Sequence, residues 1–205
     1  MNIFRQLLVK PWLTEQDAAL ELQDVRTFSL PTPMLGLRVF LIVVMVFFTL
    51  MISAFTERRL FSDWHSTPVP WLLWLNTGIL VLSSIAMHWA WTNARREQMD
   101  GLRLWLSVGG ILTLTFLLGQ LLAWRELMAL GHFASTDPAN AFFYMFTAVH
   151  GVHLVGGLVA WSRTTAKIRR GSKADDVRLS VELCTVYWHF LLLIWLILFA
   201  LLLLT

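Results

Sequence analysis

The sequence has 205 residues, of which 57% are hydrophobic and 14% are charged, and its mean hydropathy is +0.65. A soluble domain would carry about 25% charged residues, so the composition excludes an ordinary water-soluble domain and indicates an integral membrane protein. The net charge of +3 is small and predicts no nucleic-acid partner, and the single cysteine, Cys184, excludes an internal disulfide and a cysteine-based metal cluster.

The first 35 residues precede any long apolar stretch. Charged residues interrupt their short apolar patches, and no small-residue cleavage site follows a continuous apolar core, so no secretory signal peptide is predicted. We expect this segment to lie in the cytoplasm or at the membrane interface. The motif SLPTP, at residues 29–33, is predicted to be an extended lead-in to the first span.

Five stretches are apolar for about the 20 residues that crossing the hydrocarbon core requires. They cover residues 37–55, 71–91, 102–127, 141–162 and 179–204. Because the connections between them are short, residues 36–205 are predicted to form one all-α membrane domain, a bundle of five transmembrane helices. No proline interrupts a span and no two spans are matched broken helices, which counts against a transporter built from inverted repeats.

The basic residues predict the orientation of this bundle. The side that holds the N-terminus carries 13 of the 16 lysines and arginines, and the other side carries Arg58, Arg59 and Arg125. Cytoplasmic loops are enriched in basic residues, so the N-terminus is predicted to be cytoplasmic and the C-terminus periplasmic.

The connection SRTTAKIRRGSKADDVR, between the fourth and fifth spans, is the most basic one. Lys167, Arg169 and Arg170 are candidates to bind anionic lipid headgroups, at about 1 kcal/mol each. Charge that only sets the topology explains the same residues equally well.

The last two spans contain ionisable side chains inside the membrane. His150 and His153 are three residues apart on one helical face, and Glu182 and His189 return to nearly one face after two turns. An unpaired polar group in hydrocarbon costs several kcal/mol, so these side chains are predicted to satisfy one another in an intramembrane polar seam. Two alternatives use the same residues, namely ligation of a haem or metal by the imidazoles and a proton relay through Glu182.

Small residues recur in the third and fourth spans at spacings that let a neighbouring backbone approach closely. A glutamine beside them is expected to form an interhelical hydrogen bond. The predicted helix-packing residues are Thr115, Gly119, Gln120, Ala123, Gly151, Gly156 and Gly157.

Four stretches, in order along the chain, resemble the cytochrome c oxidase subunit III family of the haem–copper oxidases. They are WLLWLNTGILVLSSIAM, LLGQLLAWREL, FYMFTAVHGVHLVGG and VELCTVYWHFLLLIWLILF. The residues of the last stretch that are in register with the family's terminal helix are Glu182, Trp188, His189 and Trp195. The resemblance covers about residues 34–205 and is to the short, five-helix bacterial forms.

Two positions depart from the family's pattern and indicate a divergent branch. Val44 stands where the first conserved helix commonly carries a glutamate, and Leu192 stands where the terminal helix commonly carries an aspartate three residues after its histidine. Neither position can supply a carboxylate for proton transfer.

The resemblance implies a non-catalytic accessory subunit III of a bacterial haem–copper terminal oxidase, in the inner membrane. It implies that this chain has no catalytic or metal-binding residue, that partner subunits hold haem and copper, and that the partners are subunit I, subunit II and membrane phospholipids. The expected role is to stabilise subunit I and to support proton uptake coupled to oxygen reduction in aerobic electron transport. Three alternatives are an accessory subunit of a nitric oxide reductase, a haem-binding membrane electron carrier and a small transporter.

Overall fold

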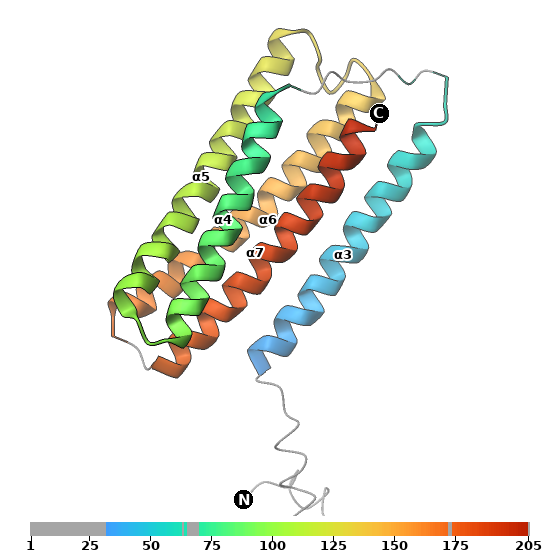
Figure 1. The fold of residues 1–205 in the computed structure, drawn as a ribbon. Helices are drawn as coiled ribbons and strands as arrows, with labels where there is room; N and C mark the ends of the chain where they lie inside the picture. The colour runs from blue at the N-terminus through green and yellow to red at the C-terminus, as the bar shows by residue number, and fades with distance from the viewer. Residues whose placement is uncertain (1–31, 63, 65–69, 172–173, 205) are drawn as a thin grey trace, which may run out of the picture. The chain divides into compact units, whose positions relative to one another are not determined.

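A computed structural model describes residues 32–62, 64, 70–171 and 174–204. The elements, in chain order, are α3 (Thr32–Arg58), α4 (Leu72–Arg95), α5 (Met99–Ala129), α6 (Pro138–Arg169) and α7 (Ala174–Leu203) (Figure 1). All five are long and apolar enough to cross a membrane, and no strand occurs among the described residues. The predicted all-α fold with five spans is therefore confirmed.

Most of the helices run past the predicted span ends, because apolar composition marks the hydrocarbon core whereas a helix continues into the headgroup region. Pro138 starts α6 at a position where its missing N–H is not needed. Of the predicted cytoplasmic or interfacial segment, residues 1–35, residues 1–31 lie outside the described residues. Of the predicted extended lead-in, Thr32 and Pro33 are instead the first residues of α3, where a proline is tolerated within the first turn.

A residue with a left-handed backbone conformation follows the end of three of the helices. After α5, Gly131 has φ of 85°, and the N–H of His132 donates to the carbonyl of Leu127 over 3.0 Å. Gly171, after α6, has φ of 69°. Glu97 takes the same role after α4 with φ of 57°, a conformation that costs a non-glycine residue about 1–2 kcal/mol. These turns reverse the chain within a few residues, which makes consecutive helices antiparallel neighbours.

The four helices α4–α7 form a closed bundle. In this bundle α4 packs against α5 and α7, and α6 packs against the same two helices (Figure 1). Every large side chain of the bundle centre is therefore enclosed by several helices, and the wholly buried ones include Trp188, Trp195, Phe116 and Phe146.

Helix α3 is joined to the bundle differently. The chain divides into two compact units at residue 40, and residues 41–58 of α3 belong to the unit that contains the bundle. No Cα atom of this part of α3 lies within 8 Å of a Cα atom of α4–α7. Aromatic side chains make the contact instead. The ring centroids of Phe48 and His153 are 5.5 Å apart, and those of Phe55 and Phe146 are also 5.5 Å apart.

Candidate functional site

A network of one indole and two hydroxyl groups lies at the centre of the bundle. The Nε1–H of Trp188 on α7 donates to Thr113 Oγ1 on α5 over 2.9 Å and to Ser83 Oγ on α4 over 3.2 Å. The two hydroxyls lie 2.8 Å apart, and each donates to the carbonyl of Gly109. A hydroxyl that donates to a helix carbonyl keeps its lone pairs free, so this pair can accept the indole proton inside hydrocarbon.

Other indole groups repeat this arrangement along the bundle. The Nε1–H of Trp195 donates to Thr77 Oγ1 on α4 over 3.0 Å, and that of Trp161 donates to the carbonyl of Leu106 on α5 over 2.8 Å. Each bond joins two different helices. The indoles thus supply interhelical hydrogen bonds where only packing would otherwise hold the helices together.

His150, one of the predicted seam residues, is wholly buried but is not part of this network. Its ring packs against Trp195, with ring centroids 5.1 Å apart, and against Phe116 at 6.0 Å. Neither ring nitrogen has a hydrogen bond. Its surroundings are those of an aromatic core residue.

The other three predicted seam residues each face a different environment. His153 donates from Nδ1 to the carbonyl of Val149 on its own helix, and the Nδ1 of His189 lies 2.5 Å from Ser84 Oγ on α4. Glu182 is half-buried on α7. No hydrogen bond joins any two of the four seam residues within the described part of the chain.

Sequence reasoning missed the hydroxyl groups that carry the interhelical hydrogen bonds. Ser83 and Ser84 stand next to each other in an otherwise apolar span, and they point to α5 and α7 respectively. These two adjacent serines were the feature of the sequence that could have indicated the interhelical hydrogen bonds. A serine in a membrane helix is so easily satisfied by its own backbone that the pattern does not reveal a partner.

Two of the predicted packing glycines lie at close helix contacts. A Cβ atom on Gly157 would lie 2.9 Å from the ring of Tyr187 and 3.2 Å from that of Trp188, and a Cβ atom on Gly119 would collide with the side chain of Asn76. Ala123 is wholly buried. These positions bring α6 against α7 and α5 against α4.

The remaining packing residues do not mark close contacts of this kind. Thr115 is exposed and donates to the carbonyl of Ile111. A Cβ atom added to Gly156 would meet nothing within 4 Å, and one added to Gly151 would meet only Leu117 at 3.8 Å. Gln120 is buried, but neither of its amide atoms has a hydrogen bond, so the expected interhelical bond is not seen among the described residues.

Sequence reasoning also missed a close contact between α5 and α6. A Cβ atom on Gly110 would collide with the indole of Trp161, and one on the adjacent Gly109 would lie 2.8 Å from the sulfur of Met87. The two adjacent glycines were the feature of the sequence that could have indicated this close contact.

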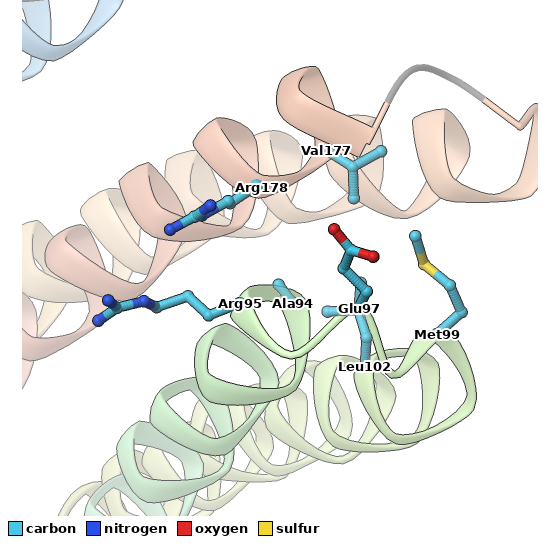
Figure 2. A pocket seen from close by; sticks show the side chains of 7 residues that line it. All are labelled: Ala94, Arg95, Glu97, Met99, Leu102, Val177 and Arg178. Atoms are coloured by element: carbon cyan, nitrogen blue, oxygen red, sulfur yellow. The ribbon is translucent and has the colours of Figure 1, made fainter.

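Among the described residues, the bundle contains an open groove and a small cavity. The groove, of about 430 Å³, runs between α5 and α6, and its lining is almost wholly apolar. The cavity, of about 30 Å³, has room for about one water molecule and lies at the end of the bundle that holds the α4–α5 turn (Figure 2). Its lining residues are Ala94, Arg95, Glu97, Met99, Leu102, Val177 and Arg178. The cavity is therefore too small for an organic cofactor.

The predicted lipid-binding residues lie at the same end of the bundle. Lys167 Nζ donates to Ser180 Oγ over 3.0 Å, which ties α6 to α7. Arg169 and Arg170, at the end of α6, are exposed. No group of three or more histidine, cysteine, aspartate or glutamate side chains that could hold a metal ion occurs among the described residues.

Comparisons with known proteins agree on one family. The family model of cytochrome c oxidase subunit III matches residues 21–204. Cytochrome c oxidase subunit 3 of Thermostichus vulcanus is 31% identical over 173 residues, which cover 82% of this chain and 85% of the relative. The subunit 3 of a Synechocystis strain is 29% identical over 82% of this chain and 73% of its own length. A probable cytochrome c oxidase subunit 3 of Mycobacterium bovis is 32% identical over 126 residues, 60% of this chain and 61% of the relative.

Proposed function

The chain belongs to the cytochrome c oxidase subunit III family, and we propose that it is the accessory subunit III of a bacterial haem–copper terminal oxidase. In this proposal the catalytic subunit I holds the haem and copper, subunit II completes the core of the complex, and this chain stabilises subunit I in the inner membrane. The multi-pass character of the chain supports a place in that membrane.

The observation that carries the proposal is the use of the buried polar side chains. The indoles of Trp188, Trp195 and Trp161 each join two helices by hydrogen bonds. His150 packs among aromatic rings, and His153 donates to its own helix. The indoles thus attach one helix to another, as a scaffold requires. An electron carrier would instead use its buried imidazoles as haem ligands.

Support for proton uptake is part of the proposal, and we propose that it acts through subunit I. Val44 is buried on α3, and Leu192 is half-buried on α7, so neither of these positions brings a carboxylate into the membrane. The contribution of this chain is then to hold the proton-conducting subunit in its working form. The same two substitutions favour a divergent complex, and an accessory subunit of a nitric oxide reductase is therefore the second candidate.

A tagged version of the chain tests the proposal. After mild-detergent purification we expect a haem-bearing partner in stoichiometric amount, with a Soret band and reduction of oxygen. Reduction of nitric oxide instead would select the second candidate. A Soret band in the isolated chain that is lost in His150→Ala would identify an electron carrier. A colourless chain without a redox partner would contradict every one of these functions.

The basic end of α6 provides a separate prediction about phospholipid. Exchanging Arg169 and Arg170 for glutamine should lower the anionic phospholipid retained after purification by about thirtyfold, because each arginine near the surface contributes about 1 kcal/mol. Adding Lys167→Gln should have a smaller further effect, because this side chain is already bonded to Ser180. Mass spectrometry of the bound lipid measures the change.

The control for this experiment is a pair of arginines predicted to lie on the opposite side of the membrane. The variant with Arg59→Gln and Arg125→Gln removes the same charge and should retain the lipid. Equal lipid content in the two variants would show that the basic residues of α6 only set the topology.

A further inference from the structure

Two imidazoles lie on the outer surface of the bundle. His88 on α4 and His189 on α7 are both exposed, and their ring centroids are 5.8 Å apart with the planes inclined by 48°. This contrasts with His150, which is wholly buried. The two helices pack against each other, so the rings form one continuous polar patch on the face that α4 and α7 share.

Both histidines lie within the predicted spans. His189 is near the middle of α7 (Ala174–Leu203), and His88 is three residues from the predicted span end at residue 91. Ionisable side chains at such depths almost always face a protein interior or a water-filled cavity, because hydrocarbon cannot solvate them. An exposed pair on a single chain therefore indicates a surface that becomes an interior in a larger assembly.

The two rings also have unused hydrogen-bonding capacity. The Nδ1 of His189 lies 2.5 Å from Ser84 Oγ, but its Nε2 has no hydrogen-bond partner in the described part of the chain. The same holds for both ring nitrogens of His88. In either tautomer of each imidazole, a ring N–H or a nitrogen lone pair is left to be satisfied from outside.

A continuous strip leads from this patch to the basic end of the bundle. Arg95 Cζ lies 4.9 Å above the ring of Trp91, whose ring lies 5.5 Å from that of His88. We call Ser84, His88, Trp91, Arg95 and His189 the α4–α7 strip. Arg95 carries a positive charge, the imidazoles offer ring N–H groups, and no residue of the strip carries a carboxylate, so the strip is complementary to a hydrogen-bond acceptor or an acidic side chain.

A second arginine lies beside the Arg95 end of the α4–α7 strip. Arg178, from the first turns of α7, and Arg95, from the end of α4, extend in the same direction along the two helices (Figure 2). Both line the small cavity at the α4–α5 turn. Glu97 lines the same cavity, so basic side chains from both helices and one carboxylate meet at this end of the face.

The outer faces of α5 and α6 carry large exposed apolar side chains. The exposed side chains of α5 include Ile111 and Leu118, at 61% and 63%, and those of α6 include Val152 and Val155, at 69% and 52%. Lipid tails suit these faces without any partner. The ring contacts of α3 are directed to α6, not to the strip. The exposed imidazole pair thus distinguishes the α4–α7 face from the faces of α5 and α6.

We infer that the α4–α7 strip docks against a transmembrane helix of the haem-bearing partner subunit, and that this helix presents an acceptor side chain at the depth of His88 and His189. The inference rests on the proposed function and specifies which face of this chain meets the partner.

A photo-crosslinking amino acid placed at Val186 tests this assignment in the intact complex in native membranes. Val186 is one turn from His189 and 43% exposed, and Val159 on α6 is a matched control at 48%. We expect an adduct between position 186 and the haem-bearing subunit, identified by mass spectrometry, at least tenfold above that from position 159.

The alternative adducts each overturn the inference. An adduct of position 186 with lipid, with a second copy of this chain or with residues 1–31 of the same chain would assign the strip to that occupant. If the complex copurifies and position 186 gives no partner adduct, the docking face is wrong and the proposed function stands. If no haem-bearing subunit copurifies with the wild-type chain, the proposed function itself fails.

Substitution of the two histidines provides a second measurement. The double variant with His88→Leu and His189→Leu should leave the isolated chain folded, with only a small drop in its thermal unfolding temperature from the lost bond between His189 and Ser84. It should lower the recovered partner at least fivefold. His189→Gln alone, which keeps a hydrogen-bonding group, should retain most of the partner. Full recovery of the partner with the double leucine variant would contradict the inference.

Discussion

Replacing Trp188 with alanine is expected to lower the free energy of unfolding by about 3–5 kcal/mol, the range for loss of a buried tryptophan side chain. The indole is 1% exposed and fills the space where α4, α5 and α7 meet. In a membrane the loss comes mainly from the cavity left among packed side chains, since lipid tails are as apolar as the protein core. Unfolding in mixed detergent micelles measures the change.

A conservative variant separates the indole's hydrogen bonds from its volume. Trp188→Phe keeps most of the ring but removes the N–H that Ser83 and Thr113 accept. The two hydroxyls still donate to the carbonyl of Gly109, so the cost should be about 0.6 kcal/mol, as is typical for one interhelical hydrogen bond in a membrane. Equal losses for the alanine and phenylalanine variants would show that the hydrogen bonds, and not the volume, stabilise this junction.

Replacing Gly157 with leucine is expected to lower the free energy of unfolding by about 1–3 kcal/mol and to separate α6 from α7. Even a single Cβ atom would lie 2.9 Å from the ring of Tyr187 and 3.2 Å from that of Trp188. Both rings are held in place, because Tyr187 donates to the carbonyl of His153 and Trp188 belongs to the central network. Neither ring can move aside without breaking a hydrogen bond.

The adjacent glycine is the control. Gly156 is exposed, and nothing lies within 4 Å of the position of an added Cβ atom. Gly156→Leu should therefore be neutral or slightly stabilising, since leucine favours the helix over glycine by about 0.8 kcal/mol. If the two variants unfolded alike, the helix contact at Gly157 would contribute nothing to stability.

The five spans could be predicted from the sequence because crossing hydrocarbon imposes a length and a composition on each of them. The helix ends could not be predicted as well, because they depend on local turn geometry. Gly131 and Gly171 have a residue type that signals a left-handed helix end, but Glu97 takes the same conformation without any such signal. The predicted orientation of the termini stays a prediction.

For the candidate site, helical periodicity predicted which residues share a face of one helix, but not which residues of other helices they contact. Spacing placed His150 and His153 near one face of α6, but it could not fix how α6 rotates against α7. In the structure His150 packs against aromatic rings, and His189 turns away from α6 to Ser84 on α4. That partner is 105 positions away in sequence, so the choice depends on how the helices pack and not on local pattern.

The rings that join α3 to α6 have a consequence for how the protein tolerates bilayers of different thickness. The contacts of Phe48 and Phe55 involve no hydrogen bond, whereas indole and imidazole groups anchor α7 to its neighbours. When the hydrophobic length of the protein and the lipid do not match, α3 can slide along the membrane normal at less cost than α7 can. The closed bundle then keeps one geometry while its outlying helix absorbs the mismatch.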